Sequence, residues 1–299
     1  QSEQATAIRD VLLMELKKQN VGVVCGCGIR GIEKTAKGFT FHTKGGDFYA
    51  TKCIMATGGK TLRKSGSDGS GFLYLESLGH HIIDLVPGLI GLKGKQSFFA
   101  DIAGIRADAK VDLYIESTHV CSERGELQLT NYGISGIPVF QLSRVAARAL
   151  SEQKKVYATL NFVPFWEKEQ CLTYFKERFK KADEKHIGEA LIGFFPEKLI
   201  PVLLEESHIK AAKYANRLQT EELERFIDTV QGLRVDITDW NTFDTAQVTA
   251  GGVDTDEIDA ETMESKLCPG LYFAGEMVDI DGICGGYNLQ WAWSSGAVA

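Results

Sequence analysis

The residues that could do chemistry gather near the end of the chain, in the stretch PGLYFAGEMVDIDGICGGYNLQWAWSSG at residues 269–296. An apolar strand is expected over residues 271–274, and its carboxyl end is where open α/β sheets bind ligands. A glycine-rich loop then leads into a helix, whose free N–H groups and positive dipole end favour an electron-rich group. The residues placed to contact such a group are Gly275, Glu276, Gly285, Gly286, Tyr287, Asn288 and Leu289.

On pattern alone, a strand, a glycine turn and a helix are equally typical of an α/β protein with no ligand there. The stretch, however, resembles the C-terminal signature of the HI0933-like family of flavoproteins, which includes aminoacetone oxidases and a bile-acid reductase. The resemblance implies FAD as cofactor, with the amides of residues 285–289 facing the N1 and C2 carbonyl edge of the flavin. It places Glu276 near the ribityl hydroxyls or the diphosphate. Asp279 and Asp281 are expected either to orient this loop or to be turn residues.

Two earlier segments also resemble sequences of this family. CIMATGG at residues 53–59 is predicted to be a buried strand that ends in two glycines, and SGSDGSGFLYLESLGHHI at residues 65–82 resembles the family's glycine turn and following helix. Ser70 and Arg63 depart from the family pattern there, and a plain surface turn is the alternative. His80 and His81 are expected to cap the helix or lie on the surface. The resemblance implies that Ala56, Thr57, Gly58 and Gly59 lie against the diphosphate and adenosine side of FAD.

A third segment that resembles the family spans residues 100–143. ADIAGIRADAKV and GELQLTNYGISGIPVFQLS resemble a strand opening and a loop of the family, although Asn131 stands where a histidine is usual and Ile137 interrupts a Gly-Pro pair. These departures indicate that substrate chemistry could differ. The resemblance implies that Asn131, Tyr132 and Ser135 line the substrate site.

The start of the chain lacks the strand, GxGxxG and helix that open a dinucleotide-binding unit. The nearest string, CGCGIRGIE at residues 25–33, is followed by β-type sequence and is interpreted as a strand with a turn. Residues 1–25 predict a helix with Ser2 as its cap and Ile8, Val11, Leu12 and Leu16 on one face, then a strand over residues 21–25. We therefore expect the sequence to begin inside the flavin domain, without its N-terminal βαβ unit.

The pattern of the remaining segments predicts the domain organisation. Short alternating runs before residue 56 are typical of a small antiparallel excursion, and residues 87–118 are rich in strands that suggest a β-barrel or sandwich. Helices follow, and Leu172, Phe175 and Phe179 form a core stripe on one of them. The expected fold is α/β: a Rossmann-like FAD/NAD(P)-binding domain, incomplete at its N-terminus, with an inserted β-barrel plus helical domain. Its predicted parts are residues 1–85, 86–245 and 246–299.

Composition narrows the class of protein. With a net charge of −7, the chain lacks the excess of positive charge that binding to a nucleic-acid backbone requires. No apolar stretch approaches the roughly 18 residues of a membrane span. Seven cysteines at irregular spacing favour neither a disulfide framework nor zinc, and no metal is expected. We expect a cytoplasmic protein that acts on a small molecule, and the oligomeric state is open.

Two functions are consistent with these patterns. The first is an FAD-dependent oxidoreductase that transfers hydride between flavin and a small organic substrate, either as a reductase with NAD(P)H as donor or as an amine oxidase with oxygen. The second is a non-catalytic flavin-binding fragment or interaction module. The sequence names no catalytic residue, because the flavin would carry the chemistry.

Overall fold

The structure, a computed structural model, describes residues 4–299 of the chain. The chain forms two compact units, residues 1–53 and residues 54–299. The predicted domain boundaries after residues 85 and 245 fall inside the second unit and stay predictions.

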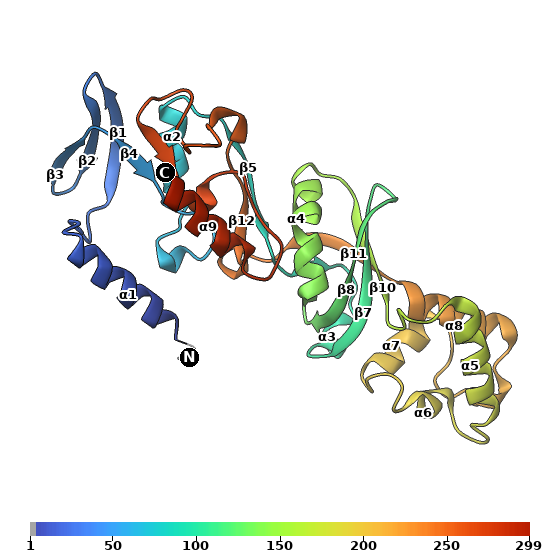
Figure 1. The fold of residues 1–299 in the computed structure, drawn as a ribbon. Coiled ribbons are helices and arrows are strands. Elements are labelled where there is room, and N and C mark those ends of the chain that lie inside the picture. Colours follow the sequence, from blue (N-terminus) through green and yellow to red (C-terminus); the bar gives the residue numbers. More distant parts are fainter. Residues whose placement is uncertain (1–3) are drawn as a thin grey trace. The chain divides into compact units, whose positions relative to one another are not determined.

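The first unit contains a helix and a small antiparallel sheet (Figure 1). Helix α1 is Ala5–Lys18, and the sheet runs through β1 (Ile29–Thr35), β2 (Gly38–Thr43) and β3 (Gly46–Ala50) in that order. Gly38 has a φ of +140°, and a Cβ there would lie 2.1 Å from the carbonyl oxygen of Ala50, so only glycine fits this turn. The predicted antiparallel excursion is confirmed, as is the turn and strand, with no helix, at residues 25–33.

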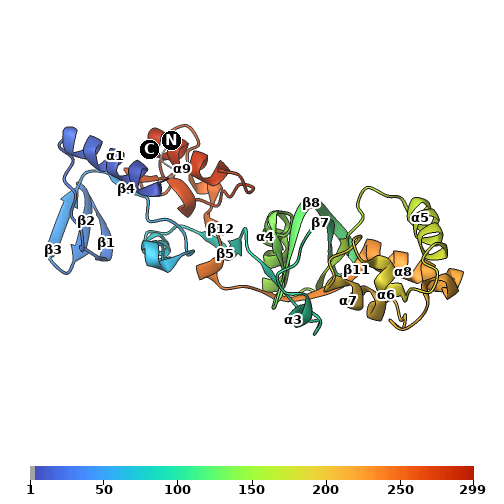
Figure 2. The same cartoon turned by 90° about the horizontal axis from the view of Figure 1, so that it is seen from below.

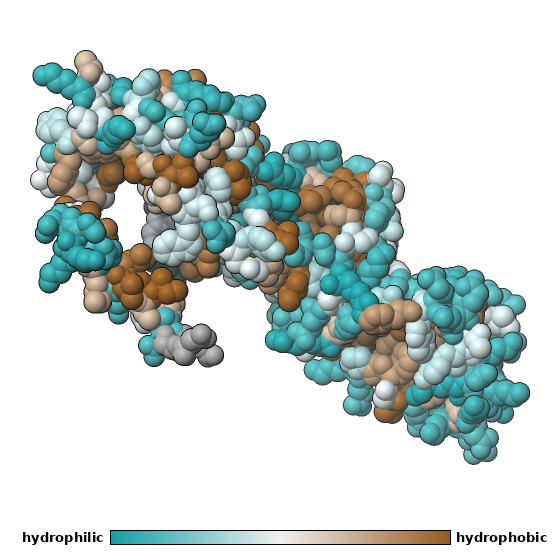
Figure 3. Space-filling view, viewed as in Figure 1, coloured by the Kyte–Doolittle hydropathy of each residue, from teal (hydrophilic) through white to brown (hydrophobic). Residues whose placement is uncertain are grey.

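Residues 21–25 and the apolar face of α1 differ from what the sequence predicts. The strand over residues 21–25 is wrong: these residues adopt no regular structure, because a strand needs a partner for its ladder and the described residues provide none there. The helix is confirmed, but its apolar stripe is exposed, with Ile8 at 60% and Val11 at 64%, and Figure 3 shows apolar side chains on the surface of α1. The predicted cap Ser2 lies outside the described residues.

Six strands of the described chain close into a β-barrel in the second unit (Figures 1 and 2). Side chains on β7 and β10 alternate between buried and partly exposed, with Val111, Leu113, Ala158 and Leu160 in the interior, as the two-residue period of a strand requires. The predicted barrel is therefore confirmed. In the order in which they pair, the strands are β10 (Val156–Asn161), β11 (Leu233–Trp240), β6 (Leu92–Gly94), β9 (Gly133–Gly136), β8 (Thr118–Thr130) and β7 (Arg106–Ile115).

Helices complete this part of the unit. The 15-residue α4 (Ile137–Ser151) packs along β8 and β7, and the short α3 (Phe99–Ile102) contacts β8. A helical group follows β10, and Phe175 there meets Phe226 edge to face at 5.5 Å, so the predicted core stripe is confirmed. The group consists of α5 (Lys168–Lys180), α6 (Ile187–Leu191), α7 (Leu199–Glu206) and α8 (Thr220–Gly232).

The chain enters and leaves the barrel along two paired strands. β5 (Ile82–Gly88) and β12 (Val248–Val253) run antiparallel, with Gly88 opposite Val248. Gly251 lies in a bulge of β12 at a φ of +99°. Only glycine fits there, because a Cβ would lie 2.4 Å from the Asp84 carbonyl oxygen. Segments far apart in the sequence therefore meet where the barrel begins.

The remaining elements carry the predicted cofactor residues. β4 (Cys53–Met55) pairs with β13 (Leu271–Phe273), α2 (Ser70–Ser77) follows the glycine turn, and α9 (Tyr287–Val298) ends the chain. The strand, loop and helix predicted for the last 30 residues are confirmed. Among the described residues, no helix combines the length and apolarity that crossing a bilayer demands.

The predicted position of His80 is wrong. This histidine is 4% exposed, whereas a capping or surface role was expected. Its Nδ1 lies 2.9 Å from Oε2 of Glu257, and its Nε2 lies 3.0 Å from Oγ of Ser265. The N–H groups of Leu267 and Cys268 donate to that Oγ, so its proton is free for Nε2, and Nδ1–H then donates to Glu257. Because Ser265 is itself buried, we interpret the Glu257, His80 and Ser265 contacts as a structural junction and do not assign Ser265 as a nucleophile.

Replacing His80 with alanine is expected to lower the free energy of unfolding by about 2–4 kcal/mol, because a buried ring is removed and the buried Ser265 hydroxyl loses its acceptor. Urea denaturation measures this loss. The matched control is His81→Ala, whose side chain is 65% exposed and pairs with Asp254 at 3.3 Å, and which should cost under about 1 kcal/mol. Equal losses in the two variants would contradict the junction.

Candidate functional site

The turn at residues 56–59 is held tightly against neighbouring backbone. β4 leads into it, and the N–H of Ala274 donates to the Met55 carbonyl at 3.0 Å. Gly58 has a φ of +75°, and a Cβ on Gly59 would lie 2.2 Å from Oγ1 of Thr249. No side chain fits at Gly59, because Thr249 and the Glu276 carboxylate fill the space beside it.

Glu276 fastens this turn to β12. Its carboxylate accepts the N–H of Thr249 at 2.7 Å and the N–H of Gly59 at 3.1 Å. Thr249 adds a third bond, because its Oγ1 accepts the N–H of Lys60 at 2.8 Å. The sequence pointed to Glu276 and the glycines but not to Thr249, which only tertiary pairing of β12 brings here. A direct contact between Glu276 and FAD stays a prediction.

Burial raises the pKa of Glu276 above its ordinary value of 4.5, and the two amide N–H groups oppose that rise. The native state then holds this proton more tightly than the unfolded chain does. The corresponding stabilisation is complete below pH 4.5 and is lost as the pH rises through the raised pKa.

We expect the difference in unfolding free energy between wild type and Glu276→Gln to decrease with rising pH above that value. The amide does not titrate, so subtracting the two curves removes the other groups. Urea denaturation from about pH 4 to about pH 8 measures it. A difference that stays constant over this range would contradict the assigned burial.

A hollow of about 440 Å³ opens beside the turn. Thr57, Gly58, Gln247 and Glu276 are among its lining residues, together with Ser67. The hydroxyl oxygen of Ser67 is buried and has no hydrogen-bond partner in the described part of the chain. Buried polar atoms are almost always paired, so this hydroxyl indicates a polar ligand in the hollow. A set of hydroxyls and exposed backbone fits the polyol and phosphate portion of FAD.

The loop before α9 is arranged to expose amides. Gly285 and Gly286 have φ values of +129° and +93°, which favour glycine. The N–H of Gln290 donates to the Gly286 carbonyl at 3.0 Å, so the N–H groups of residues 287–289 precede the intrahelical pattern. Asn288 closes the loop by exchanging two hydrogen bonds with the backbone of Gly282. The predicted cluster of free amides is thus compatible with the backbone found here.

Apolar side chains flank these amides. Ile283, Tyr287 and Leu289 are 51%, 58% and 68% exposed. A planar aromatic ring would cover such side chains while its polar edge meets the amides, so this end of α9 fits the flavin ring. The contacts of Tyr287, Asn288 and Leu289 with a flavin stay predictions.

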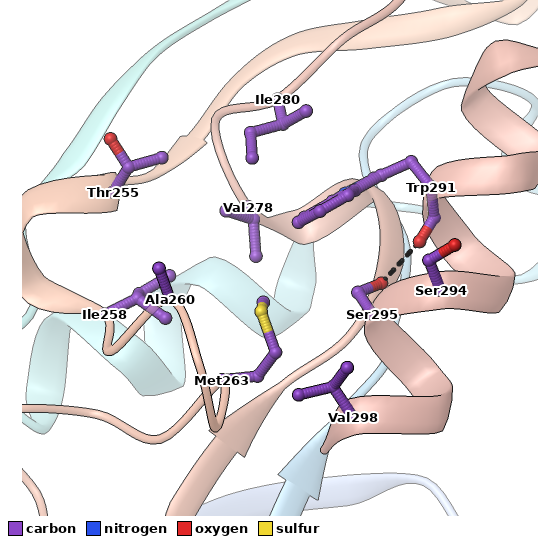
Figure 4. A pocket seen from close by; sticks show the side chains of 10 residues that line it. All are labelled: Thr255, Ile258, Ala260, Met263, Val278, Ile280, Trp291, Ser294, Ser295 and Val298. Carbon is purple, nitrogen blue, oxygen red and sulfur yellow. Dashed lines mark hydrogen bonds between the residues drawn. The ribbon is translucent and has the colours of Figure 1, made fainter.

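Gly275 connects α9 to the strand. Its N–H donates to Oγ of Ser295 at 2.9 Å, and its carbonyl accepts Nε1–H of Trp291 at 3.0 Å. Both partners line an apolar pocket of about 260 Å³ beside α9, together with Met263 and Val278 (Figure 4). Gly275 therefore orients α9 through its own backbone.

The predicted substrate residues lie in the barrel. Asn131 and Tyr132 are at the turn between β8 and β9, and Ser135 is 7% exposed within β9. The ring of Tyr132 packs against Gly91, where a Cβ would lie 2.6 Å from its hydroxyl. Their role in substrate binding stays a prediction. The described residues contain no group of three or more His, Cys, Asp or Glu side chains that could hold a metal ion.

The chain is similar over nearly its whole length to known proteins. The profile of the HI0933-like protein Rossmann domain matches residues 1–299. A 3-dehydro-bile acid delta(4,6)-reductase of Clostridium scindens is 43% identical over 298 residues, which cover 100% of this chain and 73% of that protein. Ribosomal RNA dihydrouridine synthases of Escherichia coli and Haemophilus influenzae are 29% and 27% identical, over 98% of this chain and 70% and 71% of theirs.

Proposed function

Because this chain belongs to the HI0933-like family, whose Rossmann domain binds FAD and whose members are flavin oxidoreductases, we propose that it reduces a carbon–carbon double bond conjugated to a carbonyl in a small organic molecule. The observation that carries the proposal is the set of glycine-exposed amides at the start of α9, combined with the hollow that holds the unpaired Ser67 hydroxyl.

The names of the relatives support this choice of reaction. A delta(4,6)-reductase of a 3-oxo compound reduces double bonds conjugated to that carbonyl, and dihydrouridine is uridine in which the double bond conjugated to a ring carbonyl is saturated. The two substrates share little besides this conjugated group. We therefore extend the reaction type to this chain and leave the alternative of amine oxidation to the test.

Bound FAD, once reduced, would supply hydride to the electron-poor end of such a double bond, and a proton from solvent would add to the neighbouring carbon. The residues of this chain have supporting roles. The N–H groups at the start of α9 and the positive end of its dipole stabilise negative charge at the pyrimidine edge. Glu276 and the 56–59 turn hold the backbone against which the ribityl and phosphate groups lie, with Thr57 and Ser67 as hydroxyl partners. Asn131 and Tyr132 are the proposed contacts for the substrate.

We propose a small-molecule substrate rather than RNA. The two RNA-modifying relatives make RNA the second candidate. The identity to them is lower, at 29% and 27% against 43%. The net charge of −7 also works against binding a phosphate backbone. An NAD(P)H donor and a cytoplasmic location stay predictions from the sequence.

An anaerobic half-reaction tests the proposal. The full-length protein is loaded with FAD, photoreduced, and mixed with a conjugated 3-oxo steroid, with its saturated ketone, or with uridine-containing RNA. In a separate experiment the oxidised protein is mixed with a small primary amine. The conjugated steroid should reoxidise the flavin at least about tenfold faster than the saturated ketone does. Reoxidation by RNA alone would favour the second candidate, and reduction of the oxidised enzyme by the amine would establish an oxidase instead.

A further inference from the structure

One face of α4 contacts the loop that leads to α9. Nη1 of Arg144 donates to the carboxylate of Asp281 at 2.8 Å and to its carbonyl oxygen at 3.2 Å. Nη2 of Arg148 donates to the carboxylate of Asp279 at 3.2 Å. Oε1 of Gln141 accepts the N–H of Cys284 at 3.0 Å. The barrel's longest helix therefore touches the loop at three points.

The three points form a matched register. Residues 141, 144 and 148 are spaced by three and four, so they share one face of the helix. Their partners at 284, 281 and 279 follow in the opposite direction, so helix and loop run antiparallel over the whole contact. Such a sequence of side-chain bonds fixes the path of the loop as well as its distance from the helix.

The contact is anchored on both sides. Asp279 also accepts the N–H of Gly251 at 3.0 Å, which ties the loop to β12. Ala147 is buried among Val86 and Ala250, so α4 itself is packed against the β5 and β12 pair. The helix and the loop are therefore both attached to β12, and neither can shift without breaking contacts to that strand.

Burial distinguishes these ion pairs from ordinary surface pairs. The side chain of Asp281 is only 10% exposed and that of Asp279 is 23% exposed, whereas both arginine side chains are 41% exposed, so burial is on the carboxylate side. Burial raises the pKa of Asp281, and the charge of Arg144 opposes the rise. Removing the guanidinium leaves a buried carboxylate without its partner, which is far more costly than loss of an exposed pair.

We propose that Arg144 and Arg148 are positioning residues, through which α4 of the barrel holds residues 279–284 and so sets the orientation of the amides that residues 285–289 present to the flavin. The inference rests on the proposed function for the identity of the ligand. It adds that the part of the molecule expected to hold the substrate also fixes the electrostatic environment of the cofactor. Mutations in α4 should then alter the flavin although they touch neither flavin nor substrate.

Hydrogen exchange in the full-length protein, followed by mass spectrometry without added FAD, tests the mechanical half. Arg144→Gln should speed exchange in the peptide covering residues 279–286 by roughly 5- to 30-fold, with a larger change in the Arg144→Gln, Arg148→Gln double variant. Barrel peptides from β7 and β8 should keep their protection, which shows that the variant is folded. The control is Arg106→Gln, which removes a barrel ion pair whose side chains are 62% and 59% exposed. Unchanged exchange in residues 279–286 would overturn the inference.

The midpoint potential of the bound flavin tests the electrostatic half, and a merely structural role would not move it. In Arg144→Gln the potential should become more negative, because misplaced amides stabilise the reduced cofactor less, and Arg144→Lys should restore part of the shift. A potential equal to that of Arg106→Gln, together with faster loop exchange, would overturn the positioning role while leaving the proposed function intact. A wild-type protein that binds no FAD would instead overturn the proposed function, and the exchange comparison would still decide whether α4 holds the loop.

Discussion

The Glu276→Ala variant is expected to lose most of its FAD and about 2–4 kcal/mol of unfolding free energy. Its carboxylate accepts two partly buried backbone N–H groups, from Gly59 and Thr249. Removing the carboxylate leaves these two donors without their acceptor, which costs about 1–3 kcal/mol for each buried group, while the cost of burying the charge is relieved. Without the carboxylate the 56–59 turn is no longer held beside the hollow. Flavin content by absorption after gel filtration and urea denaturation measure the two effects.

The matched control for this prediction is Glu261→Ala. Glu261 is an exposed glutamate in the same part of the second unit, and its loss should change stability by under about 0.5 kcal/mol and leave flavin content unchanged. If Glu276→Ala retains FAD at the wild-type level, the carboxylate has no part in the cofactor site and the turn is held by other contacts.

The Gly286→Val variant is expected to bind FAD at least about tenfold more weakly while the barrel stays folded. Gly286 caps α9 at a φ of +93°, and a β-branched residue there is strained by roughly 1–3 kcal/mol. The backbone relieves that strain by turning its amides, which are the groups proposed to meet the flavin. Titration of the apoprotein with FAD, followed by quenching of flavin fluorescence, gives the affinity.

Gly296 offers the control in the same helix. A Cβ on Gly296 would meet no atom within 4 Å, and its φ lies outside the left-handed range. Gly296→Ala should therefore keep FAD affinity and stabilise α9 by about 0.5–1 kcal/mol. Equal affinities in Gly286→Val and Gly296→Ala would show that the path of the backbone before α9 does not matter for the cofactor.

Those parts of the fold that rest on local signals could be predicted from the sequence. The strand, loop and helix after Pro269 follow from a short apolar run, two adjacent glycines and a helical segment. The barrel follows from alternating strands, and its interior residues Val111 and Leu113 sit at the expected two-residue spacing. In these segments the signal lies within a few residues, so tertiary context had little to override.

Features that depend on distant partners could not be predicted. His80 is separated from Glu257 by 177 residues, so a histidine after a glycine looked like a surface residue. Thr249 reaches Gly59 only because β12 pairs with β5. Nothing in the pattern of α4 distinguishes Arg144 from an ordinary charged residue on a helix surface. Residues 21–25 show the converse error, since β-branched residues predicted a strand that has no partner among the described residues.

The crystal structure of the full-length protein with FAD bound is the most direct test of the assigned site. We expect the pyrimidine edge of the ring within about 3.2 Å of backbone N–H groups between residues 285 and 289, with the ribityl and phosphate groups beside the 56–59 turn and Ser67. A flavin bound away from the start of α9, or amides there that face only protein atoms, would contradict it.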